Sequence, residues 1–377
     1  MKKILITGGA GFIGSRVALK LIEKGYLVTV LDNLSVQIHG DKPEETSPLY
    51  QSILGKLDFI NGSVTNMSDW EKAIKEQDAV IHMAAETGTG QSMYCIEKYV
   101  NVNSLGTANL LDILANKENQ IQKVIIPSSR AIYGEGKYLH PILGAVYPSS
   151  RKEQDMLAGN FEVKYSDDKD LQLVPTDENS KIHPSSLYGI TKYNQEQMIM
   201  TVCPSLNINA VALRYQNVYG PGQSLSNPYT GILSIFSTQI LNRNEINIFE
   251  DGKESRDFVY IDDVVDATIL ALEKDEANNQ VFNVGTGIPT DVVNVAKTLV
   301  KEYNIEVPFK ITGNFRIGDI RHNIADISKI ETLLGYSPKI SFSEGIQKFC
   351  SWVLEQEVYE DNLEKSLQEM KEKGLYK

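Results

Sequence analysis

The sequence contains little cysteine and no long apolar run. Three cysteines, Cys95, Cys203 and Cys350, occur among 377 residues, and no C-x-x-C pair is present. Three scattered thiols cannot build a disulfide framework, and they favour a reducing, cytoplasmic location. No stretch reaches the roughly 18 apolar residues that a membrane-spanning helix needs, so we predict no transmembrane segment.

Basic residues are in deficit as well. The chain has 37 Lys and Arg against 49 Asp and Glu, which gives a formal net charge of -12. Such a chain is a poor general binder of nucleic acid or of anionic membranes, so we predict neither as a partner. The five histidines are scattered without the spacing of metal ligands, and we predict no metal site. The composition is otherwise that of a globular protein long enough for two compact units.

The first part of the chain alternates short apolar segments with helical patterns. This alternation predicts an α/β fold in which helices cover both faces of a doubly wound parallel sheet. The predicted strands are residues 3–7, 27–31, 79–83, 123–126 and 209–214, and the predicted helices are residues 12–24, 100–115 and 188–201.

The pattern changes in three places. Residues 135–181 are polar with little periodicity, and we interpret them as an inserted surface loop region. After about residue 220 the segments shorten, with a helix over 231–241 and strands over 245–249 and 257–260, before a helix that begins at Asp262. We therefore predict a dinucleotide-binding domain over 1–220 and a smaller, interleaved α/β substrate domain over 221–377, some segments of which return to the first. The charged tail, residues 355–377, is interpreted as a solvated helix.

A glycine loop follows the first predicted strand and opens the first predicted helix. Gly8, Gly11 and Gly14 have the spacing G-x-x-G-x-x-G, which permits a tight turn and a close approach of the backbone to a pyrophosphate. The free N–H groups of the helix then face the phosphates. Asp32 ends the second strand, where a carboxylate accepts hydrogen bonds from ribose hydroxyls and repels a 2′-phosphate. Asn33 rather than an arginine follows it, so we predict NAD rather than NADP.

Tyr188 and Lys192 form a Y-x-x-x-K pair, which places both side chains on one face of a helix. A lysine cation close to a phenol lowers the pKa of the phenol and makes it a usable base near neutral pH. Ser129 ends a predicted strand, where its hydroxyl can bond to a substrate oxygen. We predict Tyr188, Lys192 and Ser129 as the catalytic residues.

With these residues the chain resembles the extended short-chain dehydrogenases/reductases of the nucleotide-sugar epimerase/dehydratase group. The resemblance covers nearly the whole length and includes residues 78–85, 103–107, 128–134, 213–222 and 256–263. It implies a Rossmann-type fold, NAD as the cofactor, a nucleotide-diphosphate sugar as the substrate, and a homodimer that pairs through the helices at 100–115 and 188–203. The cofactor residues expected from the glycine loop and the resemblance are Gly8, Gly11, Phe12, Ile13, Gly14, Asp32, Asn33, Ser63, Val64, Met83, Ala84, Ala85, Asn103, Tyr188, Lys192 and Tyr215.

The resemblance also implies a set of substrate contacts. Arginines are suited to diphosphate because their planar guanidinium groups match phosphate oxygens. Residues 247–249 would lie near the nucleotide base. The expected substrate residues are Glu86, Thr87, Ser92, Ser129, Arg130, Asn217, Ile248, Phe249, Arg256, Arg316, Asp319 and Arg321.

The residues after Ser129 select among the reactions of the group. Resembling dehydratases carry an acidic pair at the positions of Arg130 and Ala131, and Ala131 has no proton to exchange. Elimination therefore lacks its usual agent, and oxidation of an alcohol followed by reduction of the ketone remains. We predict a 4-epimerase that acts through a transient 4-keto sugar, with Tyr188 as the base.

A narrower resemblance, over residues 84–94, 128–136 and 219–232, is to dTDP-L-rhamnose 4-epimerase-like proteins, which interconvert dTDP-L-rhamnose and dTDP-6-deoxy-L-talose. Three alternatives stay open. The chain could be a 4-epimerase for another nucleotide-sugar such as a UDP-hexose, a net 4-dehydrogenase or reductase, or a non-enzymatic NAD-binding protein. The intact Tyr188, Lys192 and Ser129 argue against the last of these.

Overall fold

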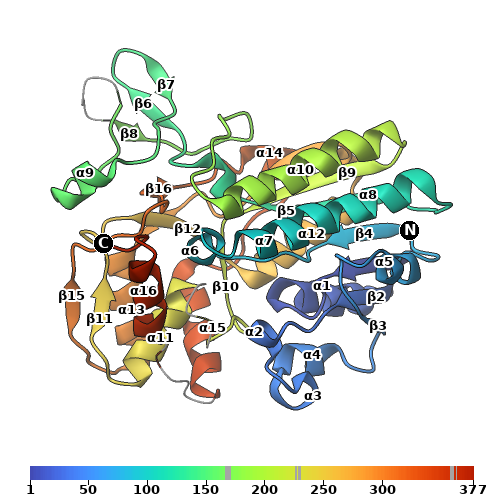
Figure 1. Ribbon diagram of the computed structural model, residues 1–377, viewed down its shortest axis with the longest axis horizontal. Coiled ribbons are helices and arrows are strands. Elements are labelled where there is room, and N and C mark those ends of the chain that lie inside the picture. The colour runs from blue at the N-terminus through green and yellow to red at the C-terminus, as the bar shows by residue number, and fades with distance from the viewer. Residues whose placement is uncertain (166–170, 226, 228–230, 357–360, 362) are drawn as a thin grey trace.

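A seven-stranded parallel sheet forms the centre of the computed structural model (Figure 1). The structure describes residues 1–165, 171–225, 227, 231–356, 361 and 363–377. The strand order is β3-β2-β1-β4-β5-β9-β13. Strands after β1 are first added on one side, as β2 and β3, and then on the other side, beginning with β4. This switch between β1 and β4 opens a crevice at the carboxyl ends of the strands. The strands are β1 (Lys3–Thr7), β2 (Leu27–Asp32), β3 (Asp58–Asn61), β4 (Ala79–His82), β5 (Lys123–Ser129), β9 (Asn209–Tyr215) and β13 (Gln280–Val284).

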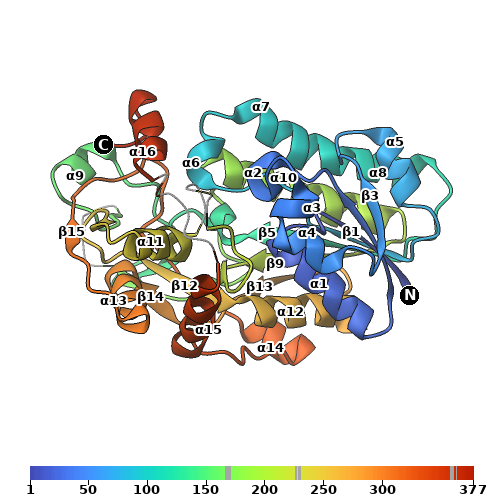
Figure 2. The same ribbon diagram turned by 90° about the horizontal axis from the view of Figure 1, so that it is seen from below.

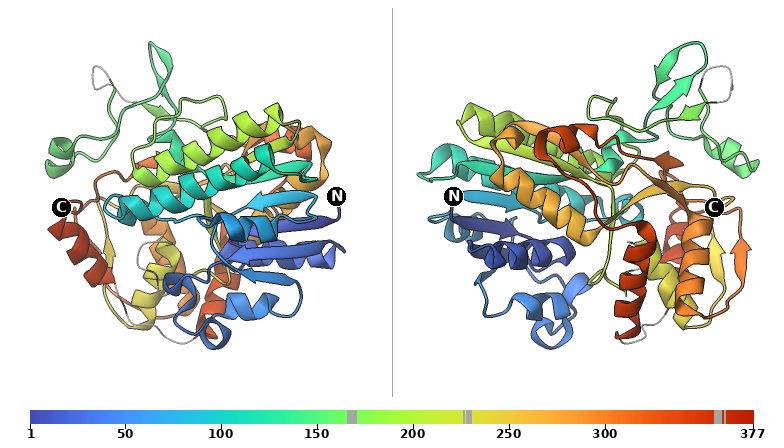
Figure 3. Two further views of the ribbon diagram at one scale, coloured as in Figure 1. Left: turned by 45° about the vertical axis from the view of Figure 1, so that its right-hand side comes forward. Right: turned by 180° about the vertical axis from the view of Figure 1, so that it is seen from behind.

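Helices cover both faces of this sheet, as the alternation predicted (Figures 1 and 3). Successive side chains of β1 point to opposite faces, so Ile4 and Ile6 enter one apolar cluster and Leu5 enters the other. The Ile4 face is covered by α1 (Phe12–Glu23) and α12 (Ile261–Glu273). The Leu5 face is covered by α5 (Met67–Ala73), α8 (Gly106–Asn116) and α10 (Leu187–Ser205). The predicted Rossmann-type α/β fold is confirmed.

The helix predicted over residues 100–115 has a wider turn at its start. It continues α7 (Ile96–Tyr99) through a π-helical segment, Val100–Leu105, into α8. Such wide turns are rare in proteins, and many of those that occur lie at functional sites. This one contains Asn103, which is fully buried.

A smaller group of sheets and helices lies beyond the carboxyl ends of the main strands (Figures 1 and 2). Strand β13 belongs to the main sheet and helix α12 packs against it, although both follow residue 220. The apolar cluster around Ile4 continues into the smaller part without a break, so the two parts share one core. The elements of the smaller part are β10 (Asn217–Tyr219), β11 (Ile246–Ile248), β12 (Ser255–Tyr260), β14 (Pro289–Asp291), β15 (Phe309–Ile311), β16 (His322–Asn323), α11 (Ile232–Leu241), α13 (Val292–Tyr303) and α15 (Phe342–Leu354).

Short helices complete the chain. Among the described residues, no helix has both the length and the apolar character that crossing a membrane requires. The short elements are α2 (Val36–His39), α3 (Pro43–Thr46), α4 (Pro48–Ile53), α6 (Thr89–Ser92), α14 (Ser328–Leu334) and the 3-10 turns Arg130–Tyr133 and Asp275–Ala277.

The insert at 135–181 is more ordered than the surface loop that we expected. It contains its own three-stranded sheet, with β6 (Tyr138–His140), β7 (Gly144–Val146) and β8 (Gln172–Leu173), and the helix α9 (Glu153–Leu157). Phe161 of the insert packs with Phe315 of the smaller part. Strands of two or three residues are too short to show periodicity in a sequence. Residues 166–170 of the insert lie outside the described residues.

The charged tail also departs from its prediction. It forms α16 (Leu363–Glu372), but Leu363, Ser366 and Met370, which share one helical face, are buried. The helix is therefore docked on one side rather than solvated all round. Of the tail, residues 357–360 and 362 lie outside the described residues, as do residues 226 and 228–230 of the segment 219–232.

Candidate active site

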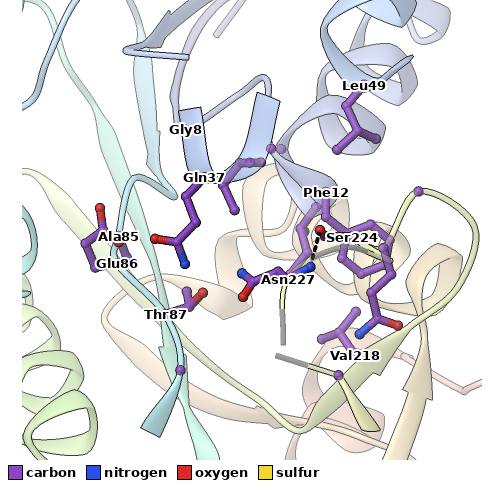
Figure 4. A pocket seen from close by; sticks show the side chains of 18 of the residues that line it. Gly8, Phe12, Gln37, Leu49, Ala85, Glu86, Thr87, Val218, Ser224 and Asn227 are labelled. Carbon is purple, nitrogen blue, oxygen red and sulfur yellow. Dashed lines mark hydrogen bonds between the residues drawn. The ribbon is translucent and has the colours of Figure 1, made fainter. Parts of the chain in front are cut away.

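A cavity of about 1430 Å³ lies at the carboxyl ends of the main strands and extends into the smaller part. Its volume exceeds the several hundred to roughly 1,000 Å³ of an ordinary single-ligand pocket, so it has room for two ligands. Figure 4 shows Phe12, at the start of α1, and Thr87, from the loop after β4, facing this space. One end is lined by the glycine loop, and the other by β12 and by the loop that contains Arg316.

The glycine loop has no room for side chains. Gly8 has φ +67°, and a Cβ there would lie 2.7 Å from the backbone nitrogen of Ala84. A Cβ on Gly14 would overlap the carbonyl oxygen of Gly8 and lie 2.7 Å from the Cα of Gly9. Gly11 is the N-cap of α1, so the free N–H groups of that helix begin at the cavity wall. This cradle of bare backbone fits a dinucleotide pyrophosphate.

Asp32 is fixed at the end of β2 beside this cradle. Its carboxylate oxygens accept hydrogen bonds from the backbone N–H groups of Ala10, at 3.0 Å, and Leu34, at 2.9 Å. His39, which the sequence analysis did not single out, lies 4.0 Å from the carboxylate and bonds to Ser47. Burial lowers the pKa of His39, which disfavours the charged imidazole that a 2′-phosphate would attract. The residues therefore fit NAD.

Most of the expected cofactor residues line the cavity, but Asn103 does not. Its side-chain oxygen accepts from the N–H of Glu86 at 2.8 Å, and its amide donates to the carbonyl of Glu86 at 3.1 Å and to Thr191 at 2.9 Å. Asn103 thus braces the loop after β4 against α10 from within the protein. The expected cofactor residues that line the cavity are Gly8, Gly11, Phe12, Ile13, Gly14, Asp32, Asn33, Ser63, Val64, Met83, Ala84, Ala85, Tyr188, Lys192 and Tyr215.

Gln37 closes the cofactor end in a way that the sequence did not indicate. Its side chain extends from α2 and donates to the side chain of Gln91, at 3.2 Å, while Lys98 donates to Gln37 at 3.4 Å. Lys98 also pairs with Glu86 at 2.9 Å. A polar bridge therefore joins the α2 and α6–α7 segments beside the cavity, where Figure 4 shows Gln37 reaching toward Thr87.

The three predicted catalytic residues meet at the middle of the cavity. Ser129 ends β5, and Tyr188 and Lys192 project from the first turns of α10 into the same space. The N-cap Ser186 accepts from Gly189, and Ser92 accepts from the N–H of Tyr188 at 3.0 Å. Ser92, which we expected to contact the substrate, is buried and does not line the cavity. It fixes the start of the helix instead.

The charges around Tyr188 differ from the expected ones. Burial raises the pKa of Tyr188, whereas a hydrogen bond with Ser129 and the charge of Arg130 lower it. Burial also lowers the pKa of Lys192 to about 7. The Lys192 ammonium donates to Gln195, one turn further along α10, at 2.7 Å, which draws it toward its own helix. Arg130 therefore supplies a positive charge beside Tyr188 that was not expected, and the role of Lys192 stays a prediction.

Arginines gather at the other end of the cavity. Arg316 pairs with Asp319 at 2.8 Å, and its guanidinium lies 5.4 Å from the ring centre of Phe249. Arg256 donates to backbone carbonyls, including that of Ile320 at 2.7 Å. Burial, and then the charge of Arg256, lower the pKa of Arg130 to about 9. Three arginines line the cavity together with Asp319, Glu250 and Glu254, and their guanidinium groups are suited to an anionic ligand.

Two further predicted substrate residues, Ile248 and Arg321, do not line the cavity. Ile248 is part of the apolar core of β11. Arg321 is fully buried and does not line the cavity, because its guanidinium pairs with Glu162, Glu250 and Asp251. The substrate residues that do line it are Glu86, Thr87, Ser129, Arg130, Asn217, Phe249, Arg256, Arg316 and Asp319.

Arg321 is the centre of a buried ion network that no motif in the sequence indicates. Its partners Glu250, Asp251 and Glu254 form the acidic group, among the described residues, whose spacing could hold a metal ion, and the guanidinium offsets part of their negative charge. Arg151 of the insert extends the network by pairing with Glu250 at 2.7 Å and with Glu135 at 3.3 Å. These partners come from distant parts of the sequence, so no local motif records them.

A cradle for a dinucleotide, a Ser/Tyr/Lys group and an anion site in one cavity define an NAD-dependent enzyme acting on a phosphorylated alcohol. The model of the NAD dependent epimerase/dehydratase family matches residues 4–154 and 162–285. The chain belongs to this family.

Similar proteins are nucleotide-sugar epimerases. The dTDP-L-rhamnose 4-epimerase of Burkholderia thailandensis is 34% identical over 358 residues, which are 94% of this chain and 96% of the relative. A putative UDP-glucose 4-epimerase of Methanocaldococcus jannaschii is also 34% identical, over 93% of this chain and 98% of the relative.

Solved structures agree. UDP-glucose 4-epimerase of Thermotoga maritima, with UDP-glucose, has a TM-score of 0.74 at 32% identity over 94% of this chain and 99% of the other. UDP-glucuronic acid 4-epimerase of Bacillus cereus, with UDP-glucuronic acid and NAD, has a TM-score of 0.76 at 27% identity and the same coverage. This chain is therefore an NAD-dependent nucleotide-sugar epimerase, an isomerase acting on carbohydrates.

Proposed function

We propose that the chain is a 4-epimerase of dTDP-L-rhamnose and dTDP-6-deoxy-L-talose. The observation that carries the reaction type is the presence of Ser129 and Tyr188 in one cavity, next to a position, Ala131, where resembling dehydratases carry an acid. Without an acid at this position to exchange protons with carbon, chemistry at a carbinol is favoured. The similarity to the rhamnose epimerase supports the sugar, and the equal similarity to a UDP-glucose epimerase keeps a UDP-hexose as the alternative.

In this mechanism Ser129 and Tyr188 hold the C4 hydroxyl of the sugar. Tyr188 removes the proton of the C4 hydroxyl while C4 loses a hydride, which together give a 4-keto sugar, and Tyr188 returns the proton when the ketone is reduced. NAD, bound at the glycine loop and Asp32, supplies the hydride acceptor and donor. Arg256 and Arg316 hold the diphosphate, so that the keto sugar turns about its phosphate link and presents its other face.

Arg130 has a separate role in this proposal. Its guanidinium lines the cavity and acts on Tyr188, and no hydrogen bond joins it to another described residue. A positive charge near the phenol favours the phenolate, which is the form that accepts the proton. Arg130 therefore lowers the pKa of Tyr188 before the substrate binds. Lys192 then binds the cofactor ribose.

The decisive experiment is incubation of the purified chain with dTDP-, UDP-, GDP- and CDP-sugars, read by NMR. A new anomeric signal from dTDP-L-rhamnose, with no net NADH, is the expected result. Turnover of a UDP-hexose alone would contradict the proposed substrate and support the proposed 4-epimerase reaction. Accumulation of NADH in proportion to the sugar would show a dehydrogenase and contradict the epimerase.

The homodimer expected from the resemblance belongs to this proposal as well. Four large apolar side chains on α7–α8 and α10 are between 40% and 55% exposed: Ile96, Val100, Leu105 and Ile190. Exposed apolar groups on adjoining helices are typical of an interface. Solution scattering should give a dimer mass for the wild type and a monomer mass for Leu105→Glu, whereas a monomeric wild type contradicts the dimer. The cytoplasmic location stays a prediction.

A further inference from the structure

The C-terminal residues, 363–377, form a segment that we call the tail, and they lie beside the substrate end of the cavity. Helix α16 stands between α6 of the main part and α9 of the insert (Figure 2). Leu363, at the start of this helix, lines the cavity and is buried. The residues that match the family model end at 285, so the family match assigns no role to the tail.

The last three residues pair with the loop that contains Arg316. The N–H of Phe315 donates to the carbonyl of Lys377 at 3.0 Å, and the reverse bond is 3.1 Å long. The N–H of Ile317 donates to the carbonyl of Leu375 at 2.9 Å. These bonds place Tyr376 opposite Arg316 in an antiparallel bridge and fix the backbone on both sides of that arginine.

The side chain of Tyr376 packs against the residues that line the cavity. Its ring centre lies 5.4 Å from that of Phe249, whose ring is also 5.4 Å from the guanidinium of Arg316. The Tyr376 hydroxyl accepts from the side-chain amide of Asn314 at 2.7 Å. Tyr376 itself does not line the cavity, whereas Phe249 and Arg316 do. It therefore holds from behind an aromatic face and a cation that are suited to a nucleoside diphosphate.

The other end of the tail contacts the main part of the molecule. The sulfur of Met370 lies 3.1 Å from the position that a Cβ on Gly90 would take, so a side chain at residue 90 would press on Met370. The ammonium of Lys373 lies 5.1 Å from the ring centre of Tyr94. Gly90 belongs to α6, whose Ser92 accepts from the N–H of Tyr188. The tail thus joins the Arg316 loop to the segment that fixes the start of the catalytic helix.

We infer that the tail is a positioning element of the nucleotide-sugar site, in which Tyr376 fixes Phe249 and Arg316 against the nucleoside diphosphate. The inference rests on the proposed function, because it takes the ligand at this end to be the nucleotide of the substrate. A positioning role at the nucleotide predicts a loss of substrate affinity. The reacting groups, Ser129 and Tyr188, and the cofactor end remain as they are.

The test compares Tyr376→Ala with Tyr376→Phe, which keeps the ring and loses the Asn314 bond, in the NAD-loaded full chain. Lys371→Ala, on the exposed side of α16, is the matched control. Binding of dTDP and UDP is measured by titration calorimetry, together with KM, kcat, bound NAD and the melting temperature. For Tyr376→Ala we expect KM and the dissociation constant of the nucleoside diphosphate to rise about ten-fold, as the loss of an aromatic pair implies.

In the same variant, kcat and bound NAD should stay at the wild-type level. Tyr376→Phe should recover most of the affinity, and Lys371→Ala should match the wild type. Unchanged KM and nucleoside diphosphate affinity in Tyr376→Ala, while the wild type turns over its sugar, would overturn the inference alone. A joint fall of kcat, bound NAD and melting temperature without a rise in KM would also overturn it, since the role would then be structural. A wild type that binds neither dTDP nor UDP and epimerises no sugar overturns the proposed function itself.

Discussion

The two ends of the cavity are built in different ways. The cofactor end consists of backbone groups from neighbouring positions, with Gly8, Gly14 and Asp32 placed by the first two strands and one helix. The substrate end consists of side chains whose supports come from the insert, the smaller part and the tail. A site made of local backbone tolerates changes elsewhere in the chain, whereas a site made of distant side chains depends on all its supports. The predictions below separate these two dependences.

The largest effect is expected from Tyr188→Phe, which removes the reacting oxygen and leaves both ends of the cavity intact. Turnover should fall by about 1,000-fold or more, the upper part of the range for a lost acid–base group. NAD released from the denatured protein, measured by absorbance, should match the wild type. Tyr193→Phe, on the same helix but away from the cavity lining, is the control. Wild-type turnover in Tyr188→Phe would rule out the mechanism.

Arg321→Met tests the supports of the substrate end. It removes the cation between the buried carboxylates of Glu250 and Glu254, of which Glu250 keeps Arg151, so the free energy of unfolding should fall by about 3–5 kcal/mol. The glycine loop is untouched, and the folded fraction should still contain NAD. Adding Glu250→Gln should recover part of the stability in urea unfolding. Equal stability of the single variant and the wild type would show that the network contributes little.

Glu254→Gln tests one charge of the same network through pH. Burial, and then the charge of Glu250, raise the pKa of Glu254 from 4.5 to about 7 in the folded protein. The folded state therefore holds the extra proton between these values, and the stability of the wild type falls as the pH rises from 4.5 to 7.

The glutamine removes this cost. Its stabilisation should be small near pH 4.5 and reach at most about 3 kcal/mol above pH 7. Urea unfolding of both proteins at pH 5 and pH 8 measures the difference. A gain that is the same at both pH values would contradict the assignment of the shift to Glu254.

Gly14→Ala tests the cofactor end alone. A Cβ at Gly14 meets backbone atoms of Gly8 and Gly9, which cannot move aside, whereas a Cβ at Gly11 meets the Gly8 carbonyl at a more tolerable 3.3 Å. We expect NAD affinity to drop roughly 10- to 100-fold in Gly14→Ala, in line with the energy of overpacking. Gly11→Ala is the control and should lose less. Fluorescence titration with NADH ranks the two, and the reverse order would refute the cradle.

The smallest expected effect is that of Arg130→Gln, which asks which cation acts on the base. The ascending limb of the kcat–pH profile, on which Tyr188 becomes the phenolate, should move to higher pH by roughly one unit, because an opposite charge is lost beside Tyr188. Arg130→Lys should restore most of the shift. An unmoved profile would return this role to Lys192.

The sequence was informative where structure is local and uninformative where it is not. The strand at Lys3–Thr7, the glycine loop and the position of Asp32 follow from periodicity and from steric needs of neighbouring residues. The family resemblance correctly brought Phe249, Arg256 and Arg316 to the cavity. β3, an edge strand with polar ends, was missed because it has no apolar run.

Errors in the site have a common cause. Arg321, Ser92 and Asn103 were expected from the resemblance to bind ligands, and each uses its polar groups on a protein partner. Which partner a buried polar group takes depends on residues far away in the sequence, such as Glu162 for Arg321. A short motif records which residues surround a ligand but not which of them face it.

The brace at Asn103 has a consequence for how the sugar preference of this chain can change. Both halves of its amide are used, the oxygen by one N–H and the nitrogen by two acceptors. A carboxylate of the same shape has no donor to offer, so even the nearest replacement would set two oxygens against each other at the base of the sugar-facing loop. We therefore expect the sugar preference to change by substitution of residues that line the cavity from this loop, such as Thr87, while Asn103 is retained.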